Sequence, residues 1–374
     1  MQIPVLSFAS ETLPSRSGQL RKGCRRCEEF PTSIEGPGTL HLSFPLSHSR
    51  AKILNYLYDS PHQCAQNGDV LSVQVEQRDL SPIVAPLMEI LTSIEQADVR
   101  VLFQARGQEM GLQDYFGIET LDTFICKTQS SWLGDFVNDG RLTNWFQPIV
   151  NLDDGSVFAY ESLMRGHENG EDIYPDRILG VARGAGLLFQ IDRAARLSSI
   201  RNAARHGLAT SSTRIFINFM PTAIYDPVNC LSSTVREVDA CGLKREQIVF
   251  EVVESEKIRD TKHLKEILDY YRAGGFGVAL DDVGAGTSGL NLLEQIRPDY
   301  MKLDMHLTRD VHLDPYKATI ASKLLEIARE VGVKTVCEGV ENHDEVQWLR
   351  DNGADYAQGY FFGRPSPKIN ELEA

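Results

Sequence analysis

The sequence predicts an α/β fold: a modified TIM-like (β/α)8 barrel with one antiparallel strand, preceded by a smaller α+β module at the N-terminus. The barrel is predicted by a regular alternation after Gly140, where eight short β-prone runs are mostly separated by segments with helical periodicity. Strand and helix in alternation indicate parallel strands joined by helical crossovers. Eight such strands suit a closed barrel, and an open doubly wound sheet is the alternative on pattern alone.

The eight β-prone runs of the predicted barrel, in chain order, are FQPIVNL (146–152), VFAYESL (157–163), RIFINF (214–219), IVFEVV (248–253), GVALDDV (277–283), YMKLDM (300–305), KTVCEGV (334–340) and YAQGYFF (356–362). The first two runs are separated only by DDGS (153–156). Such a connection is long enough for a hairpin and too short for a helical crossover. One strand is therefore expected to run antiparallel to its neighbours.

The N-terminal part of the chain differs from the barrel region in composition and in its hydrophobic pattern. Its first residues are rich in Ser, Pro, Gly and Arg, whereas Leu121, Phe124, Ile125, Leu133 and Phe136 recur near helical spacing. We divide the chain into a loosely ordered segment (1–37), an N-terminal regulatory or sensory module (38–120), a connecting helix (121–139) and the barrel domain (140–370).

Composition and charge exclude several classes of function. The chain of 374 residues suits two or three domains, and 38 Lys and Arg against 52 Asp and Glu give a net charge of −14. This charge argues against a protein that binds duplex nucleic acid or docks on an anionic membrane. No apolar run is long enough to span a bilayer, and the first residues do not have the pattern of a secretory signal, so we expect a cytoplasmic protein.

Polar residues follow most of the β-prone runs at or near their C-terminal ends. An unpaired charge is costly in a core strand, and the C-terminal ends of parallel barrel strands meet on one face. We therefore expect these side chains to line one pocket. They are Glu161, Asn218, Glu251, Glu254, Asp281, Asp282, Lys302, Asp304, Glu338, Glu341 and Gln358.

The residue types in this set indicate the chemistry of the pocket. Clustered carboxylates repel one another unless cations are bound, and a set without His or Cys favours Mg²⁺ or Mn²⁺ over Zn²⁺. So many ligands leave room for two ions, an arrangement suited to in-line attack on a phosphodiester. Lys302 should orient water or stabilise developing charge, and Arg165, four residues after Glu161, is suited to clamp a phosphate. The pattern predicts a metal-dependent hydrolase.

Seven motifs in this order resemble the EAL-domain family of cyclic di-GMP phosphodiesterases. They are ESLMR (161–165), INFMP (217–221), EVVE (251–254), LDDVGAG (280–286), YMKLD (300–304), EGVE (338–341) and QGYFFGRP (358–365). The resemblance runs from about Leu142 to Pro367. It implies hydrolysis of cyclic di-GMP to linear pGpG on a modified barrel in the bacterial cytoplasm, with two Mg²⁺ or Mn²⁺ ions. It also implies a homodimer formed through the EAL domain, and an N-terminal module that regulates it.

The resemblance also implies a role for each matching residue. Glu161, Asn218, Glu251, Asp281, Asp282 and Glu338 match the metal ligands of the family. Lys302 matches the lysine that contacts the attacking water, and Gln358 matches a residue that helps to hold this water and the metal site. The resemblance implies that Lys302, Gln358, Glu161 and Glu338 are the catalytic residues. Arg165 and Gln147 resemble contacts to the substrate phosphate and to a guanine. Glu254 resembles the glutamate that anchors the loop 283–288.

The sequence departs from the family pattern mainly in this loop. Val283 and Thr287 replace aromatic residues, and Gly289 stands where the family has a serine, while Ser162 replaces an alanine beside Glu161. We expect these changes to affect activation and dimer coupling more than chemistry. Because every metal ligand of the family has a counterpart, the sequence predicts an active enzyme.

Two other functions compete with this prediction. One is a catalytically silent EAL-type receptor for cyclic di-GMP or a protein-interaction module. The other is an unrelated barrel enzyme in which Lys302 forms a Schiff base. That chemistry needs a lysine of lowered pKa, which Asp304 and the acidic pocket oppose.

The seven cysteines do not predict a disulfide framework, because their number is odd and no export signal is present. Cys24 and Cys27 have the spacing of half a zinc site, which Cys64 and one of His41, His48 or His62 would complete as a structural Zn²⁺ centre. The alternative is two unpaired thiols in a flexible basic segment.

Overall fold

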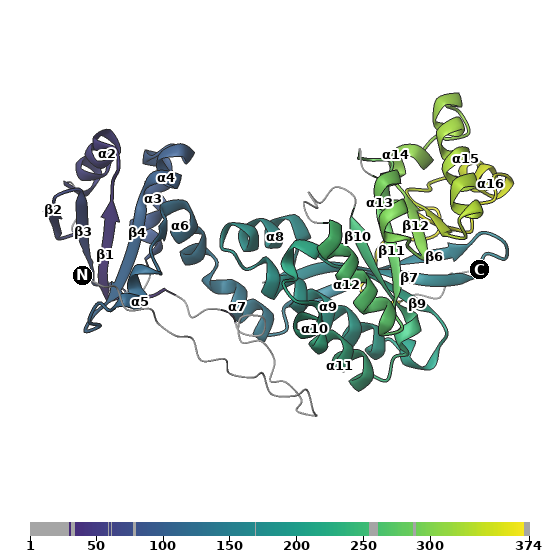
Figure 1. The fold of residues 1–374 in the computed structure, drawn as a ribbon, viewed down its shortest axis with the longest axis horizontal. Helices are drawn as coiled ribbons and strands as arrows, with labels where there is room; N and C mark the ends of the chain where they lie inside the picture. The colour runs from purple at the N-terminus through teal and green to yellow at the C-terminus, as the bar shows by residue number, and fades with distance from the viewer. Residues whose placement is uncertain are drawn as a thin grey trace, which may run out of the picture.

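The computed structural model describes residues 30, 34–58, 60, 62–77, 80–168, 170–253, 261–286 and 289–369. Within these residues the chain forms two bodies, a small N-terminal module and a larger barrel, which are joined by two consecutive helices (Figure 1). Each body has its own cluster of buried apolar side chains. None of the described helices is both long enough and apolar enough to cross a membrane.

The N-terminal module is an antiparallel sheet covered by helices. The strand order is β2-β3-β1-β4-β5, and all four pairings are antiparallel. Alternate residues such as Leu40 and Leu42 face the helices and are buried, as expected from the two-residue period of a strand. The strands are β1 (Gly38–Ser43), β2 (Cys64–Asn67), β3 (Val70–Val75), β4 (Arg100–Ala105) and β5 (Glu119–Thr120), and the helices are α2 (Ser47–Tyr58), α3 (Ser81–Ile90), α4 (Ser93–Asp98) and α5 (Leu112–Tyr115).

The predicted connecting helix is in fact two helices, α6 (Leu121–Gln129) and α7 (Ser131–Asn138). Ser130 lies between them with φ −97° and ψ 4°, and its hydroxyl donates to the carbonyl oxygen of Lys127 at 3.0 Å. A serine that bonds the preceding turn competes with the helical backbone, which explains the break. Phe124 of α6 is buried in the core of the module, whereas Phe136 of α7 is buried on the barrel side.

Eight strands close the barrel, as predicted. The order around the ring is β6-β14-β13-β12-β11-β10-β9-β7, and β7 pairs with β6 to complete it. β6 is antiparallel to both of its neighbours, and the remaining pairs in the ring are parallel. A short ninth strand, β8, extends the free end of β7. The strands are β6 (Leu142–Asn151), β7 (Val157–Glu168), β8 (Glu171–Ile173), β9 (Arg214–Asn218), β10 (Ile248–Val253), β11 (Gly277–Val283), β12 (Tyr300–Leu303), β13 (Lys334–Cys337) and β14 (Tyr356–Gln358).

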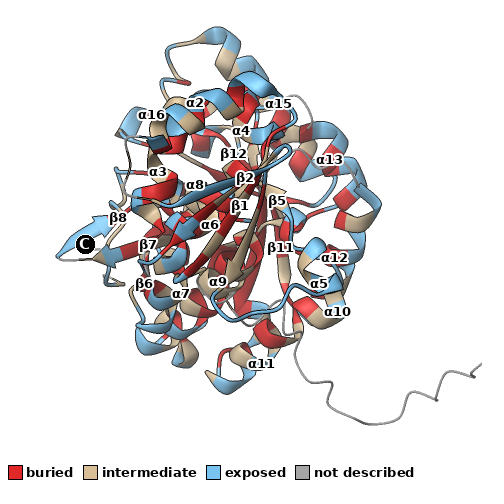
Figure 2. Cartoon of the chain, turned by 90° about the vertical axis from the view of Figure 1, so that its left-hand side faces the viewer, coloured by how far each residue is buried: buried red, intermediate tan, exposed pale blue. Residues whose placement is uncertain are grey.

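Helices cover the outside of the barrel, and the buried residues lie on its strands and on the inner sides of these helices (Figure 2). They are α8 (Pro175–Gly184), α9 (Leu188–Arg205), α10 (Pro227–Cys230), α11 (Ser232–Ala240), α12 (Thr261–Ala273), α13 (Gly289–Ile296), α14 (Met305–Thr308), α15 (Pro315–Glu330) and α16 (His343–Asp351), with 3-10 turns at Leu208–Thr210, Pro221–Ala223 and Arg245–Gln247.

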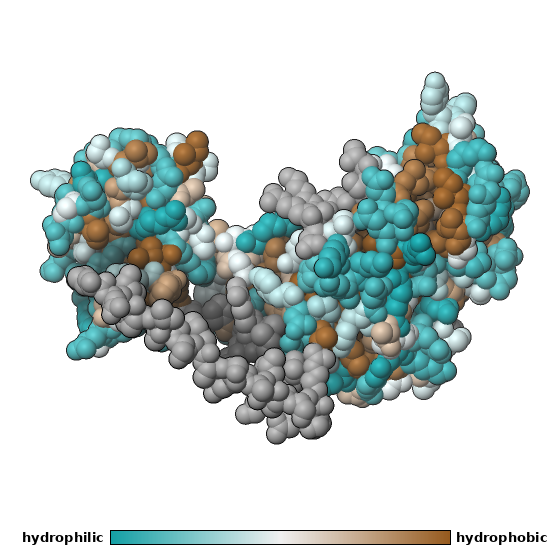
Figure 3. Space-filling view, in the orientation of Figure 1, coloured by the Kyte–Doolittle hydropathy of each residue, from teal (hydrophilic) through white to brown (hydrophobic). Residues whose placement is uncertain are grey.

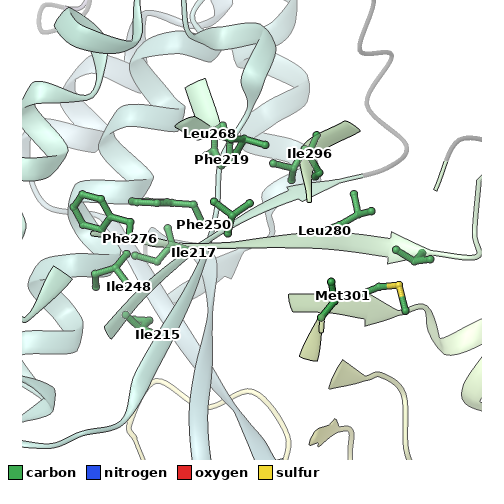
Figure 4. Packing of buried hydrophobic residues seen from close by; sticks show 14 of the residues in the cluster. Ile215, Ile217, Phe219, Ile248, Phe250, Leu268, Phe276, Leu280, Ile296 and Met301 are labelled. Carbon is green, nitrogen blue, oxygen red and sulfur yellow. The ribbon is translucent and has the colours of Figure 1, made fainter. Parts of the chain in front are cut away.

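The largest core lies between the strands and these helices. Figure 4 shows Ile217, Phe250 and Leu280 on neighbouring strands packed among residues from the helices. The rings of Phe250 and Tyr271 are stacked with 3.8 Å between their centroids. Because outward residues alternate with inward ones along a strand, this packing leaves the intervening residues to fill the interior of the barrel.

Candidate active site

The interior of the barrel has two layers, an apolar one below and a polar one above. The apolar layer consists of one residue from each ring strand: Ile149, Ala159, Phe216, Val249, Ala279, Tyr300, Val336 and Tyr356. For each of these strands, a polar side chain lies two residues further toward the C-terminal face. It belongs either to the strand itself or to the residue directly after it. We call these eight the polar ring: Gln147, Glu161, Asn218, Glu251, Asp281, Lys302, Glu338 and Gln358. A period of two residues is the spacing at which side chains point to the same face of a strand.

Lys302 lies at the centre of this ring and is almost completely buried. Its Nζ is 2.6 Å from Glu338 Oε1, 2.9 Å from Glu251 Oε1, 3.0 Å from Asp281 Oδ1 and 3.6 Å from Glu161 Oε2. Burial alone would lower the pKa of the ammonium group, but the surrounding carboxylates outweigh it and hold this pKa well above its usual value. A lysine that stays charged cannot act as a Schiff-base nucleophile, which argues against the unrelated barrel enzyme.

The carboxyl groups of the ring carry more negative charge than one lysine can balance. Burial, together with repulsion from neighbouring carboxylates, raises the pKa of Glu251 well above its usual value and raises that of Glu338 to about 8. The same causes raise the pKa of Asp281, although Lys302 opposes them in all three cases. Glu251 Oε2 is buried without a hydrogen-bond partner in the described structure.

Amide side chains hold Glu161 in place. Asn218 Nδ2 donates to Glu161 Oε1 at 3.2 Å, and Gln358 Nε2 donates to Glu161 Oε2 at 2.7 Å. Gln358 Nε2 also lies 3.0 Å from Gln147 Oε1. Asn218 of β9 and Gln358 of β14 therefore meet at this carboxylate, and Gln358 extends the network to Gln147 of β6 where the barrel closes.

A bulge in β11 brings two consecutive carboxylates to the same pocket. Consecutive residues of a regular strand point to opposite faces, but the register with β12 shifts between Leu280 and Val283, and Asp282 has a left-handed φ of 57°. Oxygens of Asp281, Asp282 and Glu338 lie within 4.8 Å of one another. Burial and the neighbouring Asp281 raise the pKa of Asp282 to about 6.

The residues present fit a site for hard divalent cations. The donors are carboxylate and amide oxygens, and burial together with mutual repulsion raises the pKa of Glu338 among them. One oxygen of Glu251 has no hydrogen-bond partner among the described residues. The carboxylates open onto a pocket of about 310 Å³, whose lining also includes Met305, Arg309, Glu341 and Tyr360. Of the predicted metal ligands, all six lie in or beside the polar ring.

Two acidic residues of the strand-end pattern have other partners. Asp304 Oδ1 accepts from the backbone N–H of His306 at 2.8 Å, so it caps the short helix α14. Glu341 forms an ion pair with Arg309 at the rim of the pocket. The expectation that both side chains line the common pocket is therefore wrong for Asp304, which is not among the residues that line it. Glu341 lines the pocket but is matched by its own cation.

Arg165 lies beyond the polar ring on the same face of β7 as Glu161. Its guanidinium is 5.1 Å from the ring centroids of Trp145 and Tyr174, and Nη1 donates to the carbonyl oxygen of Met164 at 2.7 Å. Burial lowers the pKa of this group. Arg165 is thus held above the ring and is not among the residues that line the carboxylate pocket.

The other predicted site residues lie partly outside the described structure. Glu254, Thr287, Cys24 and Cys27 are not among the described residues. Cys64 is described and exposed, and its thiol is 3.4 Å from the carbonyl oxygen of His62. Within the described residues, the group suited to hold a metal is Asp281, Asp282 and Glu338, and nothing there supports a zinc site around Cys64.

The family model that matches this chain is the EAL domain, over residues 131–365. The chain belongs to the EAL family. A probable cyclic di-GMP phosphodiesterase of Escherichia coli, PdeG, is 30% identical over 261 residues, which cover 67% of this chain and 50% of that protein. The chain spans half or less of the length of this relative and of several other curated relatives.

Solved EAL structures have the same fold. A standalone EAL protein of Vibrio cholerae, in its c-di-GMP-bound form, is 34% identical, with a TM-score of 0.56 over 62% of this chain and 95% of its own. Klebsiella pneumoniae BlrP1, in a manganese and cyclic di-GMP complex, is 20% identical with a TM-score of 0.57. That likeness covers 90% of this chain, so it includes the fold of the N-terminal module.

Sequence reasoning missed Arg309 as a residue of the pocket. It follows the four-residue helix α14 (Met305–Thr308) and carries no motif of its own. A close approach of loops places this region over the site, since a Cβ on Gly339 would lie 2.4 Å from the Cβ of Met305. No local signal in the sequence identifies such a contact between two loops.

Proposed function

We propose that this chain hydrolyses cyclic di-GMP to linear pGpG with the help of two Mg²⁺ or Mn²⁺ ions. The observation that carries the proposal is the polar ring, in which carboxylates in excess of one lysine crowd the C-terminal face of an EAL barrel. Its relatives include proteins named as cyclic di-GMP phosphodiesterases and structures solved with that nucleotide. The following paragraphs give the role of each group.

Glu161, Asn218, Glu251, Asp281, Asp282 and Glu338 are the residues proposed to hold the ions. Bound divalent ions would supply a nucleophile by lowering the pKa of a water molecule, and would neutralise charge on the phosphate. The carboxyl groups of the site lose their remaining protons when cations bind, because the positive charge stabilises the ionised form.

Lys302 is proposed to donate a hydrogen bond to the attacking water and to stabilise the charge that develops. Its four neighbouring carboxylates keep it charged, and they fix the position of its Nζ. Gln358 and Asn218 orient Glu161 through their amide groups, so that both of its oxygens keep a defined direction. Arg165, which lies beyond the polar ring, is proposed to contact a phosphate of the substrate, and Gln147 of the ring is proposed to contact a guanine.

The test is conversion of cyclic di-GMP, followed by chromatography of the linear product in the presence of Mg²⁺ or Mn²⁺. We expect turnover by the parent protein, and a loss of at least about a hundredfold in the Glu161→Gln variant, which keeps the shape of the side chain. Glu246→Gln, at an exposed residue of the 3-10 turn Arg245–Gln247 outside the polar ring, is the matched control and should retain full activity. Activity that survives thorough removal of metal by EDTA would contradict the two-ion reaction.

Binding without turnover would instead indicate a receptor for cyclic di-GMP. Calorimetry with the same samples separates this outcome from a protein that does not bind the nucleotide at all.

The assembly proposed for this function is a homodimer in the bacterial cytoplasm, formed through the EAL domain and regulated by the N-terminal module. Figure 3 shows hydrophobic residues gathered around α13 and α15, and a groove of about 780 Å³ between these helices is lined by Leu290, Leu293, Ile327 and Val331. Leu290 and Val331 are more than half exposed. Exposed apolar patches of this kind commonly mark interfaces. Sedimentation of the parent and of Leu290→Glu tests the dimer.

A further inference from the structure

The pocket above the polar ring is strongly acidic at its surface. Its lining includes Glu161, Asp281, Asp282, Glu338 and Glu341. Among the described residues that line it, Arg309 is the only cationic one. Lys302 lies beneath the lining, is 1% exposed, and is already surrounded by four carboxylates. An anionic ligand that enters this pocket therefore meets one protein cation that is accessible, and that cation is Arg309.

Arg309 is held at the rim of the pocket with hydrogen-bonding capacity to spare. Its Nη2 is ion-paired with Glu341, and both side chains are about two-fifths exposed. Its Nε is buried and has no hydrogen-bond partner in the described structure. A guanidinium has five N–H donors in a planar fork that matches the oxygens of a phosphate.

Glu345 fixes the two loops that carry this ion pair. Its side chain is 1% exposed. Oε1 accepts from the backbone N–H of Asp310 at 2.8 Å, and Oε2 accepts from the N–H groups of Glu341 at 2.7 Å and Asn342 at 3.3 Å. On the other side, Lys317 Nζ donates to the carbonyl oxygen of Arg309 at 2.8 Å. Arg309 and Glu341 are thus brought together by a buried frame.

The position of Arg309 complements that of Arg165. Arg165 lies on β7, and Arg309 follows β12 and α14. β7 and β12 are four places apart in the ring of eight strands, so they stand on opposite sides of the barrel. A cyclic dinucleotide has two phosphodiester groups on opposite sides of its ring. Arg309 at the rim of the pocket and Arg165 above the polar ring, on the opposite side of the barrel, match this charge distribution.

We propose that Arg309 binds one phosphate of the cyclic dinucleotide, and that Glu341 is the carboxylate this phosphate displaces. The inference rests on the proposed function, because it takes the cyclic dinucleotide as the ligand. Before the ligand arrives, Glu341 orients the guanidinium and competes for it. Arg309 is accordingly a binding residue, and Glu341 lowers the affinity that Arg309 would otherwise give.

The test is a double-mutant cycle on Arg309 and Glu341, measured by calorimetry with cyclic di-GMP and Ca²⁺, a combination present in a solved complex of BlrP1. We expect Arg309→Gln to raise Kd about tenfold or more, because a charge-assisted contact is lost. We expect Glu341→Gln to lower Kd, because a competitor is removed. In the double variant, Glu341→Gln should no longer lower Kd, because the arginine for which Glu341 competes is absent.

The cycle separates this competition from a general effect of charge. If the gain from Glu341→Gln persists without Arg309, the carboxylate acts by long-range repulsion and the inference is overturned. It is also overturned if both single variants weaken binding alike, as a merely structural ion pair would, or if Arg309→Gln leaves Kd unchanged. Arg245→Gln, which removes an exposed ion pair with Asp239 remote from the pocket, is the control and should not change Kd.

Steady-state kinetics supply a second readout. Arg309→Gln should raise KM more than it lowers kcat, and Arg309→Lys should restore part of the loss. A parent protein that does not bind cyclic di-GMP would overturn the proposed function as well. A parent that binds it, with an Arg309→Gln variant that binds equally well, would overturn only the role of Arg309.

Discussion

At the scale of single residues, the protonation state of the site depends on how many carboxylates surround the one ammonium group of Lys302. Glu251, Asp281 and Glu338 each lie within 3.0 Å of Lys302, and each has a raised pKa because of burial and of the other carboxylates. Without a further cation, the site is therefore expected to hold protons near neutral pH. This state has consequences that can be measured.

Metal binding should release protons. The pKa of Glu338 is about 8 and that of Asp282 is about 6, so at pH 7 the metal-free site is partly protonated. Since ligands must be ionised, Mg²⁺ or Mn²⁺ displaces these protons, and apparent metal affinity should rise as the pH increases from 6 to 8. Calorimetry in buffers of different ionisation enthalpy measures the protons released. An equal release from parent and Glu338→Gln would contradict this assignment.

Removal of the central cation should destabilise the metal-free protein in a pH-dependent way. Lys302→Met leaves buried carboxylates without their partner, at a cost of about 3–5 kcal/mol in the free energy of unfolding near pH 8. The folded-state pKa values of these acids lie above their unfolded values, so protonation relieves the cost as the pH falls. Urea unfolding at pH 8 and pH 5.5 should show the larger deficit at pH 8. A deficit independent of pH would speak against buried charge as its cause.

Most of the site residues could be predicted from the sequence, because polar residues recur at the C-terminal ends of apolar strands, which meet on one face of a parallel barrel. The pattern could not separate Asp304 from the true ring. Whether a carboxylate is satisfied by a nearby backbone N–H, as Asp304 is at the start of α14, depends on the local turn. Arg309 was not predictable for a related reason, because its place at the pocket depends on contacts between separate loops.

At the scale of elements, the loops on the C-terminal face are locked together by close approaches of the backbone. Gly339 follows Glu338, has φ of 71°, and packs against α14 so that an added Cβ would lie 2.4 Å from that of Met305.

The strand pairing of the barrel was predictable from apolar runs, but the division of the connecting helix at Ser130 was not. It depends on a side-chain hydrogen bond that competes with a helical pattern.

A pair of glycine substitutions separates crowding from backbone strain. Gly332 also has a left-handed φ, of 75°, but an added Cβ there meets no atom within 4 Å. Gly332→Ala should therefore cost only about 1 kcal/mol of strain, whereas Gly339→Ala should cost clearly more and should reduce hydrolysis, since it displaces the loop of Glu338. Thermal unfolding and turnover of the two variants make the comparison. Equal effects on both measures would show that α14 does not constrain this loop.

At the scale of the whole molecule, two separate cores predict two units of stability. The core of the N-terminal module includes Leu40 and Phe124, whereas the cores of the barrel domain begin with Leu133 of α7. Buried Glu95 ties α2 to α4 of the module through Lys52 at 2.8 Å and Ser49 at 2.9 Å. This unit has its own acid sensitivity.

Protonation of Glu95 in acid should destabilise the N-terminal module and leave the stability of the barrel unchanged. Hydrogen bonds from Lys52 and Thr92 lower the pKa of Glu95 to about 2. Its stabilising effect is therefore present above about pH 4.5 and is lost as the pH falls toward 2. Hydrogen exchange of β1 and β3, corrected for intrinsic rates, should show this loss in the parent but not in Glu95→Gln. Exchange in β10 and β11 should be equal in the two proteins.

The break at Ser130 also lies on the covalent path from the module into the barrel. α7 leads within a few residues into β6, the one strand of the barrel ring that runs against both of its neighbours. β6 carries Gln147, which is hydrogen-bonded to Gln358, and Gln358 in turn holds Glu161. A torque applied at Ser130 would thus reach the seam that closes the cylinder.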